Sequence, residues 1–230
     1  ARVITYISSV SKERELNFEM ILRLHEMLLS NIRDEIAGRF RKDDEWVRVG
    51  NHIALDPKYI EDSLNKMLID YQLSDDKHIV KRIAKLHLTF EQIHPFVDGN
   101  GRIGRTLNNF LLIKENYVPI NIKFIDRAMY YDAFDEFNSN GKTAIMEGIV
   151  GRALTNSYHK RLAYLEGKKI ITLNEYAKFN KISHTNLINK AKINKISFIG
   201  NKVFKDNVLK RVIVSEEYKF WKFISGKKFL

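Results

Sequence analysis

Twelve consecutive residues, 94–105, combine glycines and polar side chains that suit chemistry on a phosphate group. The segment reads HPFVDGNGRIGR. Gly99 and Gly101 allow a tight turn and a close approach of the backbone to a ligand. The backbone N–H groups at the start of a following helix would point at an anion held in that turn. The pattern therefore favours a phosphate-binding turn.

Four charged or titratable side chains accompany this turn. Arg102 and Arg105 are three residues apart, which makes them neighbours on one helix face, and guanidinium groups suit phosphate oxygens. Asp98 offers a hard oxygen ligand, and magnesium is usually held by one or two carboxylates together with phosphates. His94, with an ordinary pKa of about 6.5, can accept a proton from a hydroxyl. Together they indicate phosphoryl or nucleotidyl transfer.

Helices predicted from apolar periodicity must position this segment. Apolar residues recur at steps of three and four over residues 17–33, 57–71, 77–93 and 102–116. Asn17 or Ser11 could cap the first of these helices. The third should end at His94, because Pro95 disfavours helical geometry at the residue before it.

One short β-hairpin is expected among the helices. Residues 46–49 and 52–55 are β-prone and flank Gly50-Asn51, a pair suited to a type II′ turn. Strand signals are otherwise sparse before residue 170. The expected fold class is mainly α, a helical bundle with one hairpin.

Composition limits the class of protein. The chain has 230 residues, 44% of them hydrophobic, with only 3 Pro and 11 Gly, which predicts a globular fold. The absence of cysteine excludes a disulfide scaffold, thiol catalysis and cysteine-ligated zinc. No segment approaches the roughly 18 apolar residues of a membrane span, and the first residues do not resemble a secretory signal. We expect a soluble, cytoplasmic protein with no membrane partner, which either had its initiator Met trimmed or is part of a longer chain.

Charge is distributed unevenly along the chain. The formal net charge is +11, yet residues 160–230 alone hold 17 basic and 5 acidic side chains, and residues 1–159 are close to neutral. This step in charge predicts two domains, residues 1–160 and residues 161–230.

The segment at 94–105 resembles the signature HPFxxGNGRxxR of the Fic family. Its fixed positions are met by His94, Pro95, Phe96, Gly99, Asn100, Gly101, Arg102 and Arg105. The resemblance extends over most of residues 1–155, because residues 38–40 (GRF), the hairpin and a later Tyr-Tyr pair with an Asn also match. It implies a Fic-type helical bundle in which the hairpin is a flap. It also implies a protein adenylyltransferase, which moves AMP from ATP to a Ser, Thr or Tyr hydroxyl of a target protein, the chain itself included, and releases pyrophosphate.

The resemblance also implies roles for single residues. His94 would be the general base and Asp98 the magnesium ligand. Asn100 and Arg102 would contact the phosphates, and Arg105 would position the terminal phosphate. The other positions at the nucleotide would be the glycines Gly99, Gly101 and Gly104, the hairpin residues Val49, Gly50, Asn51 and His52, and the adenine-side residues Tyr130, Tyr131 and Asn138. Phe96 is expected to anchor the loop in the core.

Simpler interpretations stay open for the outer positions. As a flap, the hairpin would border the nucleotide and offer its edge to an extended target segment, but it could be a plain surface hairpin. Tyr130 and Tyr131 could be core residues. His52 is expected to be structural or peripheral rather than a second base.

Residues 143–148 match [ST]xxxE[GN], the motif of inhibitory helices in many Fic proteins. In the family the Glu of this motif pairs with the second motif arginine, here Arg105. We expect Glu147 not to inhibit, because it follows the adenine-side residues, where the family has a structural helix. An inhibitory helix would then be missing from the chain or supplied by another protein.

The basic residues 161–230 have the pattern of a winged-helix-like module. Residues 172–175 form a capping box, and Ser183 can cap a second helix. Residues 197–199 and 202–204 flank another hairpin turn. On DNA, contacts are expected from His184, Thr185, Asn186, Asn189, Lys190 and Lys202. Alternatively, an AT-rich bacterial genome accounts for the lysines, and the module is a homodimer or target-docking surface.

Two alternatives to AMP addition stay open. The chain could be a DNA-binding regulator whose Fic domain only senses nucleotide, although His94 and Asp98 would then have no task. It could also remove AMP or transfer another phosphate-linked group, because such enzymes share every motif residue.

Overall fold

The computed structural model describes residues 2–49, 52–123 and 126–166. It also describes short pieces at 170–171, 177–178, 181, 183, 185–186 and 212–213. The chain divides into two compact units, Ala1–Leu154 and Thr155–Leu230. The domain boundary expected at residue 160 stays a prediction.

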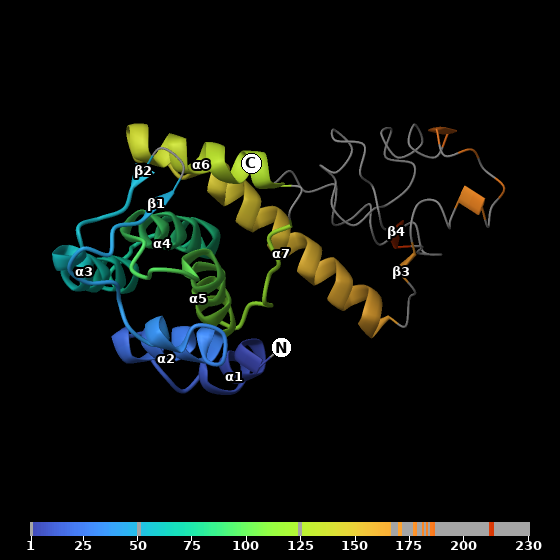
Figure 1. Ribbon diagram of the computed structural model, residues 1–230. Coiled ribbons are helices and arrows are strands. Elements are labelled where there is room, and N and C mark those ends of the chain that lie inside the picture. Colours follow the sequence, from blue (N-terminus) through green and yellow to red (C-terminus); the bar gives the residue numbers. More distant parts are fainter. Residues whose placement is uncertain are drawn as a thin grey trace. The chain divides into compact units, whose positions relative to one another are not determined.

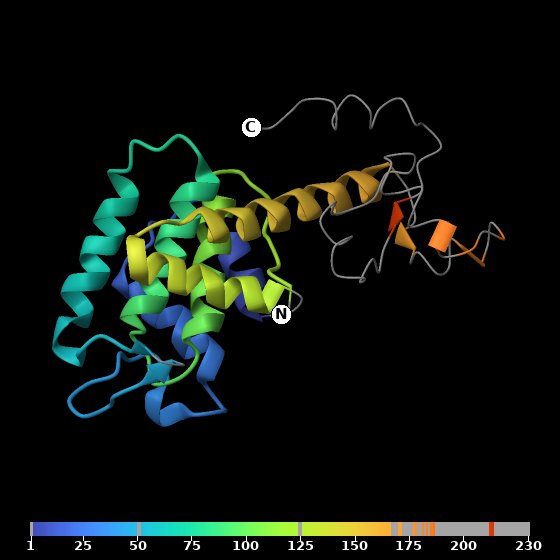
Figure 2. The same ribbon diagram turned by 90° about the horizontal axis from the view of Figure 1, so that it is seen from above.

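Two long helices lie at the centre of the first unit. They are α4 (Ile79–Ile93) and α5 (Asn100–Lys114), and Figure 1 shows them between the other helices. Helices α1 (Arg2–Val10) and α2 (Phe18–Leu29) pack against α5, whereas α3 (Ile60–Gln72) and α6 (Arg127–Asn140) pack against α4. Figure 2 shows α3 alongside α4. The loop between the two central helices, residues 94–99, therefore joins two helices that are each packed against other helices of the unit.

Burial of apolar faces holds these helices together. Ile83 and Phe90 of α4 and Leu107 and Phe110 of α5 are all fully buried. The first part of α7 (Ala144–Leu165) adds Met146, Ile149 and Val150 to the same core. Each side chain of this size stabilises the fold by about 1.5–3 kcal/mol when buried. The core therefore fixes the ends of α4 and α5 between which the loop runs.

The helices expected around the motif are present, with shifted ends. Asn17 caps α2, since its Oδ1 accepts a 2.9 Å hydrogen bond from the backbone N of Met20. Helix α4 ends where Pro95 predicts, but α5 begins two residues earlier than expected. The periodicity misses α1, and two short 3-10 helices also occur, η1 (Asp34–Ile36) and η2 (Pro57–Tyr59).

Two short strands lie where the hairpin is expected. β1 (Arg48–Val49) pairs antiparallel with β2 (His52–Ile53), and Val49 lies opposite His52. This register leaves residues 50–51 as a two-residue connection. Gly50 and Asn51 lie outside the described residues, so the turn type stays a prediction.

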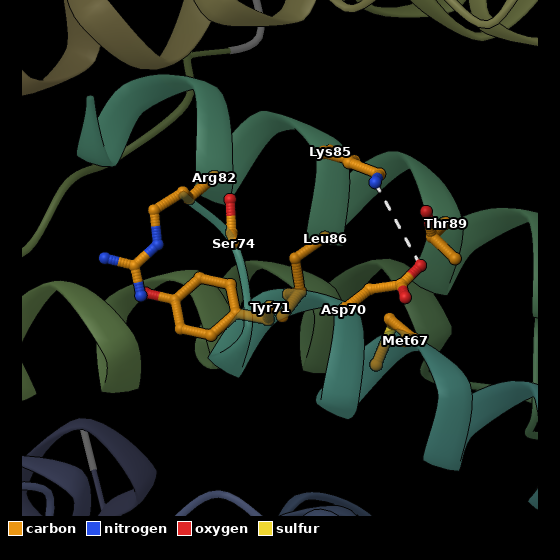
Figure 3. A pocket seen from close by; sticks show the side chains of 8 residues that line it. All are labelled: Met67, Asp70, Tyr71, Ser74, Arg82, Lys85, Leu86 and Thr89. Atoms are coloured by element: carbon orange, nitrogen blue, oxygen red, sulfur yellow. Dashed lines mark ion pairs between the residues drawn. The ribbon is translucent and has the colours of Figure 1, made fainter. Parts of the chain in front are cut away.

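A small pocket between α3 and α4 is a packing feature (Figure 3). The Arg82 guanidinium lies over the Tyr71 ring, 4.4 Å from its centroid. Both side chains bind Glu115, at 2.8 Å from the Tyr71 hydroxyl and 2.9 Å from Arg82 Nη2. Burial raises the pKa of Tyr71, and its hydrogen bond to Glu115 adds to the shift. The residues that line this pocket include none of the motif.

The second unit is described only in pieces. β3 (Ile170–Ile171) pairs antiparallel with β4 (Val212–Ile213). Ser183 Oγ accepts a 3.1 Å hydrogen bond from the backbone N of Asn186, as a helix N-cap would. Thr185 and Asn186 are exposed. The other residues predicted at DNA, His184, Asn189, Lys190 and Lys202, lie outside the described residues, as do the predicted capping box and second hairpin. Within the described part of the chain, no helix is long and apolar enough to cross a membrane.

Candidate active site

His94 directly follows α4 with a left-handed backbone, φ 49° and ψ 61°. Its backbone N–H still bonds the Phe90 carbonyl at 2.9 Å, and Pro95 prevents the helix from continuing. A residue other than glycine is strained in this conformation by roughly 1–3 kcal/mol. The surrounding structure must therefore hold His94 in place.

The orientation of the His94 ring defines its tautomer. Only 13% of the side chain is exposed, and Nδ1 lies 3.3 Å from the backbone carbonyl oxygen of Glu91. Because a carbonyl oxygen can only accept, Nδ1 carries the proton and donates it to this contact. The other ring nitrogen, Nε2, then carries the lone pair that a general base needs.

Arg41 holds the carbonyl groups at the end of α4. Its side chain is 2% exposed. Nε donates to the carbonyl of His94 at 2.7 Å, and Nη2 donates to the carbonyls of Ile93, at 3.2 Å, and Leu55. The last carbonyls of a helix lack donors within the helix, and a cation is favourable there. No motif in the sequence marks Arg41 as a site residue, although Arg41 directly follows the GRF segment.

The side chain of Asn100 bonds the backbone of the same loop. Its Oδ1 accepts from the backbone N of Phe96 at 2.9 Å, and its Nδ2 donates to the carbonyl of Phe96 at 2.7 Å. The residue is only 2% exposed. The Asn100 amide is buried and paired with the backbone of Phe96, and the predicted phosphate contact of this residue stays a prediction. A contact of this residue with phosphate would have to come from its backbone N–H.

Phe96 and His25 form the floor of the loop. Phe96 is fully buried, as expected, and its ring stacks on the imidazole of His25 with centroids 3.7 Å apart. His25 Nδ1 accepts from the backbone N of Gly38 at 3.0 Å, so Nε2 carries the proton and donates to the carbonyl of Asp98, also at 3.0 Å. Burial lowers the pKa of His25, which keeps this neutral form. The sequence does not predict a role for His25. Its place within the predicted helix at residues 17–33 is the one signal that it carries.

The turn at Asp98 and Gly99 opens α5. Gly99 has φ +85°, which favours glycine, and it leaves the helix without a side-chain cap. Asp98 Oδ1 accepts from the backbone N of Gly99 at 2.5 Å, and Arg102 Nη2 lies 3.5 Å from the same oxygen. Arg33 Nη1 lies 3.8 Å from Asp98 Oδ2. The uncapped first-turn N–H groups and the exposed Arg102 leave a positive site for an anion.

Arg105 rests on a buried polar chain that starts in α5. Asn108 Nδ2 donates to Nδ1 of His87 at 3.1 Å, so the proton of His87 is on Nε2, which donates to the Tyr130 hydroxyl at 2.7 Å. The Arg105 guanidinium lies close to this hydroxyl. Burial lowers the pKa of His87 to about 4, and the charge of Arg105 adds to the shift. Tyr130 thereby supports the second motif arginine from α6.

Comparison with known proteins identifies the domain. The model of the Fic/DOC family matches residues 15–112. This chain contains a Fic/DOC family domain. It is 32% identical to the protein adenylyltransferase Fic of Nematostella vectensis over 140 residues, which cover 59% of this chain and 32% of that protein. It is 33% identical to the protein adenylyltransferase fic-1 of Caenorhabditis elegans over 129 residues, which cover 54% of this chain and 25% of that protein.

Solved structures share the fold of this Fic domain. A Fic domain-containing signalling protein from Bacteroides thetaiotaomicron aligns with a TM-score of 0.57 at 24% identity, over 68% of each chain. A Fic family protein from Desulfovibrio desulfuricans aligns with a TM-score of 0.58 at 18% identity, over 95% of this chain and 75% of that one. The chain spans about a third of the length of the first curated relative and a quarter of the second.

Gly104 of the Fic domain lies against α4. It is buried, and a Cβ built there would lie 2.7 Å from Glu91 Oε1 and 3.1 Å from the ring of His87. Its nucleotide contact stays a prediction, because the side of the residue where a Cβ would be faces α4. Glycine is needed here for the close packing of α5 on α4.

The three adenine-side residues of the Fic domain differ in their surroundings. The Tyr130 ring packs edge-on against Phe134, with centroids 5.0 Å apart, and its hydroxyl is taken up by the polar chain described above. Tyr131 is 49% exposed. Asn138 is exposed, and its Oδ1 accepts from Gln92 Nε2 of α4. Adenine contacts from Tyr131 and Asn138 stay predictions, whereas the Tyr130 hydroxyl has a structural task.

The remaining predicted positions of the Fic domain are the hairpin residues and Glu147 of residues 143–148. The structure describes only the backbones of Val49 and His52, and Gly50 and Asn51 lie outside it, so their nucleotide contacts stay predictions. Glu147 lies in the first turn of α7, where its Oε1 accepts from the Thr143 hydroxyl at 2.5 Å. An acidic side chain at this position stabilises its own helix. This contact supports the structural interpretation of residues 143–148.

Proposed function

We propose that this chain is a protein adenylyltransferase, which transfers AMP from ATP to a Ser, Thr or Tyr hydroxyl of a target protein. The observation that carries the proposal is the loop geometry. The ring of His94, protonated on Nδ1, sits at one end of the loop, and the uncapped start of α5 with its arginines lies at the other. The names of the curated relatives support AMP transfer as the reaction.

In this reaction His94 is the general base. Its Nε2 takes the proton of the target hydroxyl, and the hydroxyl oxygen attacks the α-phosphorus of ATP. The bond between the α-phosphorus and the bridging oxygen breaks, and pyrophosphate leaves in line. The protein holds the reactants in position and neutralises charge, which together supply most of the acceleration.

The start of α5 holds the phosphates. The first-turn N–H groups, from Asn100 to Arg102, point at the anion, and the guanidinium groups of Arg102 and Arg105 supply positive charge. The Tyr130 hydroxyl, which is bonded to His87, lies close to the exposed Arg105. This arrangement fits a triphosphate better than a single phosphate, because it provides three separate sets of donors.

Asp98 fits a magnesium ion bound together with the nucleotide. Its side chain is 45% exposed, and the N–H of Gly99 fixes one oxygen. Among the described residues, no cluster of three His, Asp or Glu side chains could hold a metal ion alone, so phosphate oxygens would complete the coordination. When bound, magnesium would neutralise charge on the phosphates that Asp98 faces.

The hairpin is the proposed docking edge for the target. Trp46, just before β1, and Ile53, in β2, are each 57% exposed. An extended peptide could add to this edge through its backbone, and its hydroxyl side chain would then enter the site. An extended segment of a second copy of the chain could add to this edge in the same way, which would allow self-modification.

Labelling with two isotopic forms of ATP tests the proposed reaction. The full chain is incubated with a cell lysate and ATP labelled at the α- or the γ-phosphate. We expect protein labelling from the α-label only, and its loss in His94→Ala. His78→Ala is the matched control, because His78 is exposed at the start of α4. Labelling from the γ-label would indicate a kinase instead, and no His94-dependent labelling would favour a nucleotide-sensing regulator.

We also infer nucleic-acid binding by residues 165–230, because residues 160–230 hold 17 basic and 5 acidic side chains. Such binding depends strongly on salt, because each phosphate contact releases counterions. Fluorescence anisotropy of the full chain with random duplex DNA tests it at several salt concentrations. Binding that weakens with salt is the expected result, and no binding at low salt would favour a dimerisation or target-docking role.

A further inference from the structure

Glu91 is a buried carboxyl group beside His94 that the proposed reaction leaves without a task. It lies on the last turn of α4, and its side chain is 9% exposed. Oε2 lies 3.7 Å from Nδ1 of His94. Oε1 is buried without a hydrogen-bond partner among the described residues. Burying an ionised carboxyl group without a hydrogen-bond partner costs free energy unless a positive charge lies nearby. The position of Glu91 therefore calls for an explanation.

The groups that face Glu91 come from each element packed around it. His87 faces it from the preceding turn of α4, Arg105 from α5 and Tyr130 from α6. Burial raises the pKa of Glu91 to about 7, and the charge of Arg105 opposes this shift. His87 and Tyr130 stay neutral near pH 7, because burial lowers the pKa of the first and raises that of the second. Of the groups around Glu91, Arg105 and, once protonated, His94 are thus the positive charges that can stabilise its carboxylate.

We propose that Glu91 is a positioning residue for His94, whose carboxylate stabilises the imidazolium that forms when His94 takes the proton of the target hydroxyl. This inference rests on the proposed function for its catalytic meaning. An anion close to an imidazole favours the charged form of the ring and raises its pKa. Two groups this close titrate as a pair, so protonation of His94 and ionisation of Glu91 favour each other.

The packing of α5 preserves the position of the carboxyl group. A Cβ at Gly104 would lie 2.7 Å from Oε1, so only glycine leaves room for Glu91 in this orientation. The contact of His94 Nδ1 with the backbone carbonyl of the same residue holds the ring against the carboxyl group. The Arg41 bond to the carbonyl of His94 fixes the backbone from the other side.

NMR titration of the histidine side chains tests the pairing without substrate. In the full chain, the His94 signal is assigned by its loss in His94→Ala and followed in Glu91→Gln, which keeps the shape but removes the charge. We expect the pKa of His94 to fall by about one unit, a tenfold change in its protonation constant. Glu61→Gln, an exposed change on α3, should leave it unchanged. An unchanged pKa of His94 in folded Glu91→Gln would overturn the proposal.

Steady-state kinetics then test the catalytic meaning. Glu91→Gln should lower kcat for AMP transfer about tenfold, with little change in KM for ATP. Glu91→Asp, which keeps the charge one methylene further away, should show a smaller fall in both kcat and the pKa of His94. A loss that appears only in KM would contradict a positioning role. If the wild-type chain transfers no AMP, the proposed function fails, but the titration still decides whether Glu91 and His94 are coupled.

Discussion

The guanidinium of Arg41 donates a 2.7 Å hydrogen bond from Nε to the backbone carbonyl of His94, 53 residues further along the chain. The same side chain binds the carbonyls of Ile93 and Leu55. One buried cation thus ties the end of α4 to the segment that follows the hairpin. It binds the backbone of His94 in its left-handed conformation, next to the ring that would act as base.

Arg41→Lys should therefore reduce both stability and activity. Lysine keeps the charge but lacks the planar fork that reaches three carbonyls. We expect the free energy of unfolding to fall by roughly 2–3 kcal/mol, measured by urea denaturation, and AMP transfer to fall roughly 10- to 100-fold. Arg23→Lys, at an exposed pair with Glu26, is the control and should change neither. Full activity in Arg41→Lys would show that the base needs no such support.

Asn100→Asp tests whether the side chain of the motif asparagine stabilises the loop. The substituted side chain would place a carboxylate oxygen against the Phe96 carbonyl, where Nδ2 now donates. We expect a loss of roughly 1–3 kcal/mol in the free energy of unfolding, because a buried acceptor loses its donor. The exposed Asn65→Asp on α3 is the control. If Asn100→Asp weakened ATP binding without any loss of stability, the side chain would be a phosphate ligand after all.

Gly104→Ala should be destabilising, unlike an alanine elsewhere in a helix. Its Cβ would approach Glu91 Oε1 to 2.7 Å and the His87 ring to 3.1 Å. Overpacking of this kind costs about 1–3 kcal/mol. Gly148→Ala in α7 provides the contrast, because its nearest neighbour is a flexible Arg152 nitrogen at 3.5 Å. That substitution should stabilise the chain by about 0.5–1 kcal/mol, since alanine favours helix. Thermal unfolding of both variants gives the comparison.

The sequence was enough to identify the motif residues but not the residues elsewhere in the chain that hold the loop in place. His94, Asp98 and Arg105 could be named because their types and spacing within one short segment carry the chemistry. Arg41 and His25 could not, because their contacts with the loop span 53 and 73 residues and depend on how the helices pack. The end of α4 was also predictable, since Pro95 acts locally, whereas α5 begins two residues earlier than expected, directly after Gly99.

Asn100 and Gly104 show what residue type alone leaves open within a motif. An amide and a glycine both suit a nucleotide site, so both were predicted there. In the fold, the amide closes the loop on Phe96 and the glycine makes room for Glu91. Whether a polar group binds a ligand or the backbone depends on its direction, which spacing does not specify.

The pH dependence of stability should separate Glu91 from His87. The folded-state pKa of Glu91 is raised from 4.5 to about 7, so its contribution to stability falls as pH rises through that window. The pKa of His87 is lowered from 6.5 to about 4, so its contribution is lost as pH falls from 6.5 towards 4. Ionising buried Glu91 costs roughly 3 kcal/mol above pH 7. Glu91→Gln should therefore gain stability relative to wild type between pH 5 and pH 8, measured by urea denaturation, and a constant difference would contradict the shift.

Glu147→Gly tests the interpretation of residues 143–148. The Glu147 carboxylate accepts a 2.5 Å hydrogen bond from Thr143, within the first turn of its own helix. Removing it should lower the melting temperature, because glycine costs about 1 kcal/mol in a helix and the terminal contact is lost. Labelling from α-labelled ATP should stay at the wild-type level, with the matched variant Glu136→Gly on α6 as a control for helix destabilisation. A sharp rise in His94-dependent labelling for Glu147→Gly alone would mean that this glutamate does inhibit the site, and the structural interpretation would be wrong.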